Sequence, residues 1–351
     1  MGHRTTTTSV LVTAAVLLVL VGATPGAAAA EPSLAEIMQG HDLAVFEWNR
    51  LSQVNTTVTN ARLDALQKDG FKTIYVDISE YIEAAAQQAP LDQLNAALKD
   101  FMARAGSYGL AVHAVAGEPN WTDQALRYLG PMTVDLVAAY NNNARKSGEA
   151  QLQGVQFDIE PYVDPAWWTD VKASLKAYLS TIQAIVYRYN QVAPPDPTRL
   201  QLGVAIPFWY DGTPDVPAVQ FGASSKPAPA AFHLIDMLGA NSRAYVLVMA
   251  YRNFASHQDR MINADGSIAL VSGEFDYARK SRATCGIVIG QEFGDLADQY
   301  AFKTSFGTVG RAAFRQAASE LVATYGGRSQ FRGLSVNHLD AYEATPEHVQ
   351  E

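Results

Sequence analysis

Apolar residues along this chain gather in eight short runs, separated by longer stretches in which polar residues are frequent. The runs begin at intervals of roughly 30 to 45 residues, and most are rich in the β-branched and aromatic residues that favour strands. We expect each run to form a strand. The eight runs are LAVFEWN (43–49), FKTIYVDIS (71–79), LAVHAVAG (110–117), GVQFDIEPY (154–162), LQLGVAIPF (200–208), YVLVMAYRN (245–253), CGIVIGQEF (285–293) and RGLSVNHLD (332–340).

Most stretches between the runs have the periodicity of amphipathic helices, as when Leu94, Leu98 and Met102 recur at every fourth position. Alternating strands and helices predict parallel strands, and eight of them predict a closed (β/α)8 barrel. The alternative, an open doubly wound sheet, would want a Gly-rich phosphate-binding turn after an early strand, and the sequence has none. Only residues 341–351 follow the last run, so the eighth helix should be short or missing, and residues 34–39 could cover part of the gap.

The N-terminus has the pattern of a secretory signal peptide. Arg4 precedes an apolar run over residues 10–21, and small residues follow up to Ala30. The alternative, a retained membrane anchor, fits less well because the run is shorter than the roughly 20 residues that a spanning helix needs. We therefore expect residues 1–30 to be removed and residues 31–351 to form one secreted barrel domain, a monomer that does not associate with a membrane.

Composition narrows the possible functions. The formal net charge is −9, spread without runs, which argues against nucleic acid as a partner. Cys285, the single cysteine, lies in an apolar run and is expected to be a buried small hydrophobe. His113 and His338 are isolated from other metal-ligating residues, so we expect hydrogen-bonded packing roles for them and neither metal nor cofactor.

The fourth run, GVQFDIEPY, has an unusual polar face. Side chains alternate along a strand, so Gln156, Asp158 and Glu160 should share one face, although buried carboxylates are costly. In a (β/α)8 barrel the chemistry lies at the carboxyl ends of the strands, which would put this face at the barrel mouth. There the charge of Asp158 should raise the pKa of Glu160 toward the value that a general acid needs. The alternative is a polar row with a structural role.

Aromatic and polar residues also follow the other expected strands. All five tryptophans lie just after such strand ends, and broad aromatic faces beside carboxylates suit sugars, whose faces are apolar and whose edges bear hydroxyls. Each tryptophan alone could equally be a core residue. The expected substrate-binding residues are Glu47, Trp48, Asp77, Trp121, Tyr162, Trp209, Tyr251, Arg252 and Asn337. The Pro- and Gly-rich connection over residues 210–231 is expected to form a wall facing the substrate.

Residues 153–160, QGVQFDIE, resemble the fourth-strand motif D-G-x-D-x-D-x-E of family 18 chitinases, with matches at Gly154, Asp158 and Glu160. VMAYRN likewise resembles the Met-x-Tyr of their sixth strand, with the tyrosine at Tyr251. This resemblance implies that Glu160 protonates the glycosidic oxygen while Asp158 and Tyr251 hold an N-acetyl group that attacks the anomeric carbon. The chain departs from the pattern at Gln153 and Gln156, which replace two aspartates, and His338 lies about where the family has a tryptophan.

A second resemblance concerns the seventh run. GIVIGQEFG is similar to the Glu-Phe-Gly strand end of retaining clan A glycosidases, in which that glutamate is the nucleophile. Those enzymes take their acid/base from the end of strand four, often as Glu-Pro, and Glu160-Pro161 matches, although Ile159 replaces the usual Asn. The resemblance implies that Glu292 is the nucleophile and Glu160 the acid/base.

The sequence thus favours a secreted glycoside hydrolase that acts on a carbohydrate, with Glu160, Glu292 and Asp158 as catalytic residues. One alternative is a non-catalytic carbohydrate-binding barrel, since the fourth-strand motif has lost two aspartates. A second is substrate-assisted hydrolysis of N-acetylated sugars through Asp158, Glu160 and Tyr251. An amide or ester hydrolase fits poorly, because the sequence has neither a G-x-S-x-G nucleophile elbow nor a metal-ligand cluster.

Overall fold

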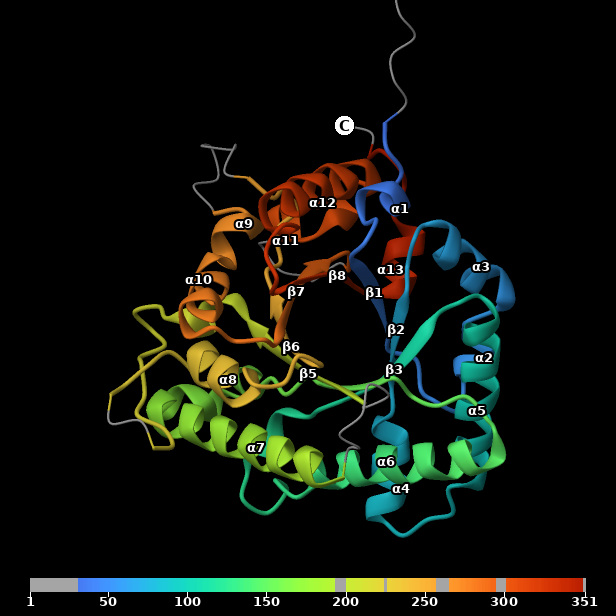
Figure 1. Ribbon diagram of the computed structural model, residues 1–351, viewed down its shortest axis with the longest axis horizontal. Helices are drawn as coiled ribbons and strands as arrows, with labels where there is room; N and C mark the ends of the chain where they lie inside the picture. Colours follow the sequence, from blue (N-terminus) through green and yellow to red (C-terminus); the bar gives the residue numbers. More distant parts are fainter. Residues whose placement is uncertain (1–30, 193–199, 224–225, 257–264, 295–300, 350–351) are drawn as a thin grey trace, which may run out of the picture. The chain divides into compact units, whose positions relative to one another are not determined.

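The computed structural model describes residues 31–192, 200–223, 226–256, 265–294 and 301–349. From Ser33 onward they form one compact unit, in which eight parallel strands close into a barrel in sequence order, as Figure 1 shows. The expected (β/α)8 barrel is confirmed. Its strands are β1 (Asp42–Glu47), β2 (Thr73–Asp77), β3 (Ala111–Ala116), β4 (Gly154–Phe157), β5 (Gln201–Pro207), β6 (Ala244–Met249), β7 (Gly286–Glu292) and β8 (Phe331–Asn337).

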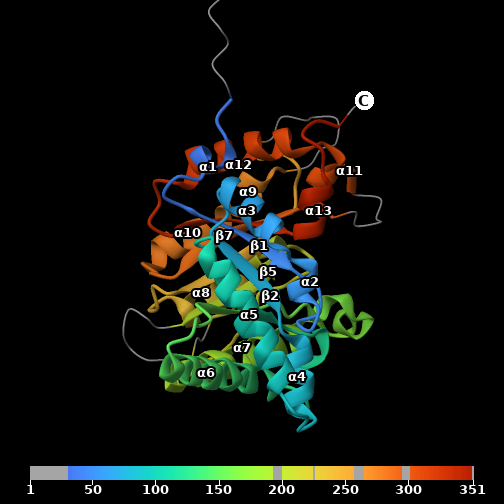
Figure 2. The same ribbon diagram turned by 90° about the vertical axis from the view of Figure 1, so that its right-hand side faces the viewer.

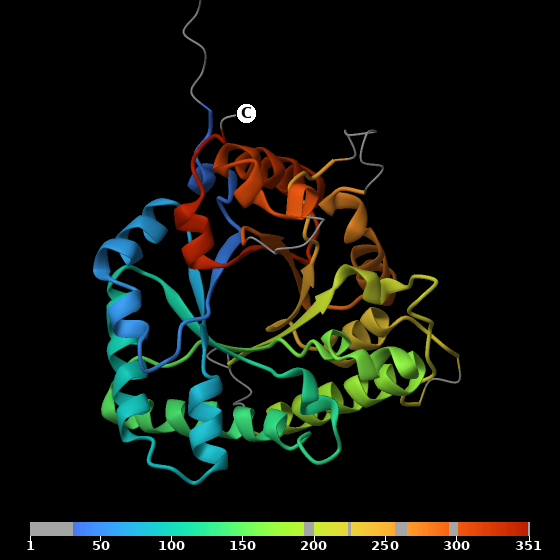
Figure 3. The same ribbon diagram turned by 180° about the vertical axis from the view of Figure 1, so that it is seen from behind.

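Helices surround the strands on the outside of the barrel, as the views from the side and from behind show (Figures 2 and 3). The last helix is short, as expected, and α1 lies against α12 near it (Figure 1). The helices are α1 (Leu34–Ile37), α2 (Val54–Thr57), α3 (Asn60–Lys68), α4 (Ser79–Ala86), α5 (Asp92–Ser107), α6 (Leu129–Ser147), α7 (Val171–Val192), α8 (Ala230–Leu238), α9 (Ser267–Leu270), α10 (Ser272–Ser281), α11 (Ala301–Thr304), α12 (Arg311–Tyr325) and α13 (Leu339–Ala344).

Alternation of side chains along the strands divides the core in two. Residues such as Val155 and Phe157 of β4 belong to the large cluster between the barrel and its helices. Residues such as Phe46, Tyr75 and Tyr245 form a second cluster inside the barrel. Side chains on one face of a strand repeat every second residue. Residues just past a strand end that continue the inward-facing series therefore face the barrel mouth. The direction in which each strand-end side chain points therefore decides whether it can reach a ligand at the mouth.

Several smaller expectations can be compared with this fold. Cys285 is buried, and burial raises the pKa of its thiol to about 11, as expected of a small hydrophobic residue. His113 is a packing residue, with Nδ1 3.3 Å from the Tyr245 hydroxyl inside the barrel. The expected signal peptide lies outside the described residues. Among the helices that are described, none combines the length and apolar character required to cross a membrane.

Candidate active site

β4 ends at Phe157, well before the end of the expected strand over residues 154–162, so Asp158 and Glu160 follow the strand instead of belonging to it. Asp158 still donates its backbone N–H to the Ala116 carbonyl of β3 over 3.0 Å, which keeps it against the barrel. Gly117 makes this approach possible, since a Cβ atom there would lie 2.2 Å from the Asp158 carbonyl oxygen. Asp158 and Glu160 therefore lie in a tight turn at the barrel mouth.

Two carboxyl groups in this turn perturb each other. The Oδ1 atom of Asp158 is buried without a hydrogen-bond partner among the described residues, whereas Glu160 Oε1 accepts a hydrogen bond from the Tyr162 hydroxyl. Burial raises the pKa of both carboxyls, and the charge of Glu160 raises that of Asp158 further. The pair consequently retains a proton at a pH where exposed carboxyls have lost theirs. A retained proton is what a general acid requires.

Glu292, the last residue of β7, is held by three hydrogen bonds. Its Oε1 accepts the backbone N–H groups of Phe293 at 2.8 Å and Gly294 at 2.5 Å, and its Oε2 accepts Asn337 Nδ2 at 2.7 Å. Asn337 in turn accepts the indole N–H of Trp48 at 2.7 Å. These contacts fix the orientation of the Glu292 carboxyl and tie it to the exposed ring of Trp48.

Two influences on the ionisation of Glu292 oppose each other. Burial raises the pKa of its carboxyl to about 7, and the charge of Glu160 adds to that effect, while the three donated hydrogen bonds favour the ionised form. Glu292 and Glu160 are therefore near enough to interact electrostatically. An oriented carboxylate of this kind, beside a second carboxyl that retains its proton, is an arrangement suited to acid and nucleophile roles.

Glu160 and Glu292 both line a cavity of about 390 Å³, which we call the acidic cavity. Four of the residues that line it are carboxylic acids, and Trp48, 39% exposed, supplies an aromatic face. The lining comprises Trp48, Asp77, Ser79, Ala116, Gly117, Pro119, Asp158, Glu160, Met249, Tyr251, Glu292 and Asn337.

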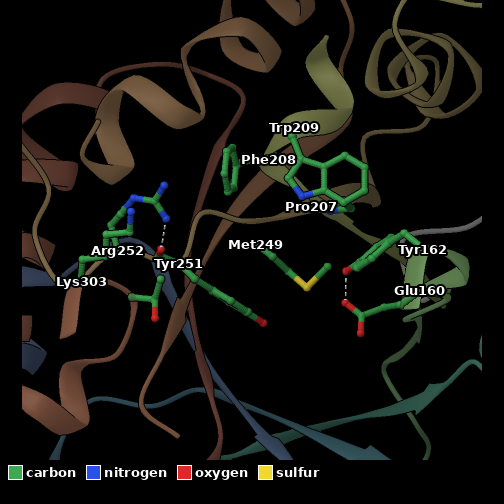
Figure 4. Close-up of a pocket in the computed structure, with 10 residues that line it drawn as sticks. Glu160, Tyr162, Pro207, Phe208, Trp209, Met249, Tyr251, Arg252 and Lys303 are labelled. Atoms are coloured by element: carbon green, nitrogen blue, oxygen red, sulfur yellow. Dashed lines mark hydrogen bonds between the residues drawn. The ribbon is translucent and has the colours of Figure 1, made fainter. Parts of the chain in front are cut away.

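The aromatic cavity, with a volume of about 480 Å³, lies on the other side of Glu160. Figure 4 shows the rings of Phe208 and Trp209 above it and the Glu160–Tyr162 pair at one side, with Arg252 and Lys303 at the other. The Tyr162 and Trp209 rings meet edge to face with centroids 4.8 Å apart. The lining comprises Glu160, Tyr162, Pro207, Phe208, Trp209, Met249, Tyr251, Arg252, Lys303 and Thr304.

Glu160, Met249 and Tyr251 line both cavities, so the two spaces adjoin at these three residues. Tyr251 is half-buried, and desolvation followed by the charge of Glu292 raises the pKa of its hydroxyl, while the Asn337 side chain lowers it. Arg252 donates to the Tyr251 carbonyl at 2.7 Å, and its guanidinium lies over the Phe208 ring. The site is thus a two-part depression with Glu160 at the junction.

Two of the expected substrate-binding residues lie elsewhere. Glu47 is 1% exposed. Its neighbours Phe46 and Trp48 face inward, so Glu47 lies on the opposite face of β1. There its carboxyl accepts hydrogen bonds from Asn49. Trp121 is 3% exposed, because the turn Pro119–Thr122 packs it into the core against α7. The expectation that these two side chains line the mouth is wrong.

The connection after β5 also differs from expectation. Of residues 210–231, none that the structure describes is in the lining of either cavity, and Val219 is buried in the core, where its carbonyl contacts His233 Nε2 of α8 at 2.8 Å. Conversely, Lys303 and Thr304 of α11 line the aromatic cavity without having been expected there. Met249 was part of an expected strand end, but its central position between the cavities was not anticipated.

Among the described residues, no group of three or more His, Cys, Asp or Glu side chains has the arrangement of a metal site.

No family model and no curated protein matches this sequence, but many solved structures share its fold. The catalytic domain of a beta-amylase from Paenibacillus polymyxa has a TM-score of 0.52 at 11% identity, covering 87% of this chain and 94% of its own. PbGH5A, a glycoside hydrolase family 5 enzyme from Prevotella bryantii B14, has a TM-score of 0.51 at 13% identity, with coverages of 92% and 96%. The exo-beta-1,4-mannosidase Op5Man5 from Opitutaceae bacterium strain TAV5 has a TM-score of 0.53 at 13% identity, with coverages of 84% and 51%.

These matches establish that the chain shares an eight-stranded barrel with the three enzymes. They do not confirm the resemblance of the strand-four motif to family 18 chitinases.

Proposed function

We propose that this protein is a secreted glycoside hydrolase of the retaining type, with Glu160 as general acid/base and Glu292 as nucleophile. The observation that supports this most strongly is that the two carboxyl groups, from the ends of β4 and β7, line one cavity at the barrel mouth. The shared fold with several carbohydrate-active enzymes is consistent with it.

The reaction would proceed in two balanced steps. The Glu292 carboxylate attacks the anomeric carbon, the bond from that carbon to the glycosidic oxygen breaks, and Glu160 gives its proton to the departing oxygen. Water then attacks the anomeric carbon of the covalent intermediate, Glu160 takes a proton from the water, and the bond to Glu292 breaks. The hydrogen bonds to Glu292 from Phe293, Gly294 and Asn337 would orient it for the first step and stabilise it as the leaving group of the second.

In the proposed reaction, each cavity would hold one half of the substrate. Glu292 lines the acidic cavity and is absent from the described lining of the aromatic cavity, whereas Glu160 lines both. Since the nucleophile attacks the glycone and the acid protonates the oxygen toward the aglycone, the glycone would occupy the acidic cavity. The aglycone would lie against Phe208 and Trp209 in the aromatic cavity.

A second mechanism is favoured by one specific observation. Asp158 and Tyr251 line the acidic cavity together with Glu160, and the Asp158 carboxyl makes no hydrogen bond with a described side chain. An N-acetyl group held there could attack the anomeric carbon in place of Glu292. The two mechanisms differ in which acidic residue is indispensable.

The test of the proposed function is the release of new reducing ends from a panel of soluble polysaccharides, with Glu160→Gln as the paired sample. Cleavage of at least one polysaccharide by the wild type, with turnover lost in the variant, is the expected result. If the protein binds a polysaccharide, as seen in its tryptophan fluorescence, but releases no reducing ends from any, it is a carbohydrate-binding barrel instead.

A further inference from the structure

We propose that the acidic cavity selects a sugar unit that bears a protonated amino group. This proposal rests on the glycoside hydrolase function above and deepens it by naming the class of glycone. Its substrates would be oligomers or polymers of hexosamine that have free amino groups.

The acidic cavity contains more carboxyl groups than the proposed reaction needs. Two of its four acids, Glu160 and Glu292, react directly as acid and nucleophile, whereas Asp77 and Asp158 take no direct part in the two steps. No Lys, Arg or His occurs in the part of its lining that the structure describes. Even with one proton shared by Asp158 and Glu160, a neutral glycone would leave the remaining negative charge of the cavity uncompensated.

Each of the two additional acids has an oxygen atom to which no described residue donates a hydrogen bond. Asp77 Oδ1 accepts the backbone N–H and the hydroxyl of Ser79 at 2.9 and 2.7 Å, and no described residue donates to its Oδ2. Asp158 receives no hydrogen bond from a described side chain, and its buried Oδ1 has no partner. Burying such groups without a partner is costly, and an ammonium group offers three donors together with the compensating charge.

Trp48 supplies an independent argument for a cationic sugar. Its ring stacks on Phe46 with centroids 5.1 Å apart, and its N–H is bonded to Asn337, so the ring is held in place with one side exposed. A fixed indole face binds the apolar face of a sugar and also attracts a nearby cation. Beyond the cavity, exposed Glu118 adds negative charge close to Asp77.

The aromatic cavity shows the opposite charge pattern. Arg252 and Lys303 line it, and among its described lining residues Glu160, which it shares with the acidic cavity, is the one carboxylic acid. An ammonium group would gain less there, so the preference for an amino sugar belongs to the glycone side. The difference between the cavities makes the prediction specific to one half of the substrate.

Equilibrium titrations with matched methyl glycosides test the proposal. Three epimeric series (gluco, galacto and manno) are each tested as the 2-amino, 2-acetamido and 2-hydroxy forms near neutral pH, with tryptophan fluorescence as the readout. In at least one series we expect the amino form to bind about tenfold or more tightly than both other forms, an advantage that added salt should reduce. The proposal is overturned if no series shows this preference, including the case in which no amino sugar binds.

Variants then test whether the acidic cavity causes the preference for the amino form. Asp77→Asn should remove most of the advantage of the amino form while changing binding of the 2-hydroxy form much less. Asp64→Asn is the matched control, because it changes the net charge equally but lies on α3, where Asp64 pairs with Lys68. Retention of the full advantage by both Asp77→Asn and Asp158→Asn would overturn the assignment to this cavity. Because binding is measured without turnover, a failure of the hydrolase proposal would be seen separately, as the absence of new reducing ends.

Discussion

The acidic and aromatic cavities adjoin at Glu160 but are built from different kinds of residue. In the acidic cavity, Glu292 is fixed by two backbone N–H groups and Asn337, and three further carboxyl groups surround the same space. In the aromatic cavity, the broad rings of Tyr162, Phe208 and Trp209 prevail, with two cations at one side. In the proposed reaction the acidic cavity holds the reacting glycone, and the aromatic cavity holds the aglycone.

This difference has an electrostatic consequence. Carboxyl groups that are buried close together resist ionisation, which keeps a proton available at neutral pH and so prepares an acid. Aromatic rings provide contact area with little directional demand, which suits a leaving group that must depart. Variants of Glu160 and Glu292 should accordingly affect turnover most, and variants of the aromatic cavity should mainly affect affinity.

The largest effect is expected for Glu292→Ala. If Glu292 is the nucleophile, turnover should fall on the order of 10⁴-fold or more, because no other group can form the glycosyl-enzyme. Azide or formate added to the assay should restore part of the activity by occupying the space that the side chain leaves. A mild loss, together with severe losses in Asp158→Asn and Tyr251→Phe, would instead support attack by a substrate N-acetyl group.

Glu160→Gln should lower kcat by roughly 10²–10⁴-fold on a substrate with a poor leaving group, because general acid catalysis is lost. Folding and ligand affinity should change little, since the replacement has nearly the same shape. Glu83→Gln is the matched control, as Glu83 is exposed on α4 and lines neither cavity in the described structure. Near-wild-type turnover in Glu160→Gln would remove Glu160 from the mechanism.

Replacing two tryptophans, one at a time, tests contributions to stability and to substrate binding separately. Trp121→Ala should cost about 3–5 kcal/mol in the free energy of unfolding, because the ring is buried in the core. Trp209→Ala should instead weaken oligosaccharide binding by about 0.5–1.5 kcal/mol, with a smaller loss of stability. Chemical denaturation and ligand titration of both variants provide the comparison, and a reversed pattern would refute the assignment of Trp209 to the substrate.

The smallest effect concerns the pH profile of kcat/KM. Activity should rise as Glu292 loses its proton, near its pKa of about 7, and fall as the Asp158–Glu160 pair loses its last proton. Asp158→Asn removes a negative charge beside Glu160, so the pKa of Glu160 should fall and the alkaline limb should move to lower pH. If that limb stays in place or moves upward, the two carboxyls do not share a proton.

Much of this site could be predicted because the barrel brings distant strand ends together. Glu160, Glu292 and Asn337 are far apart in the sequence, yet each follows an apolar run, and the carboxyl ends of parallel strands meet at one mouth. The order of runs was therefore sufficient to group them. The hydrogen bonds that fix Glu292 depend on side-chain orientations that the sequence pattern does not determine.

The errors have equally physical causes. In LAVFEWN the residues on both faces of the strand are mostly apolar, so alternation alone could not decide whether Glu47 or Trp48 faces inward. Trp121 follows its strand in a turn, where packing against α7 rather than periodicity decides exposure. Lys303 and Thr304 come from a connection with no periodic signal, and only the three-dimensional structure shows that they line the same cavity as Trp209.

The central claim is that Glu292 forms the covalent bond to the sugar while Glu160 supplies the proton. Incubation with a fluorosugar that traps the intermediate, followed by peptide mass mapping, tests this most directly. We predict that the label is found on the peptide containing Glu292 and that Glu292→Gln prevents labelling. Clean labelling of any other residue would contradict the account.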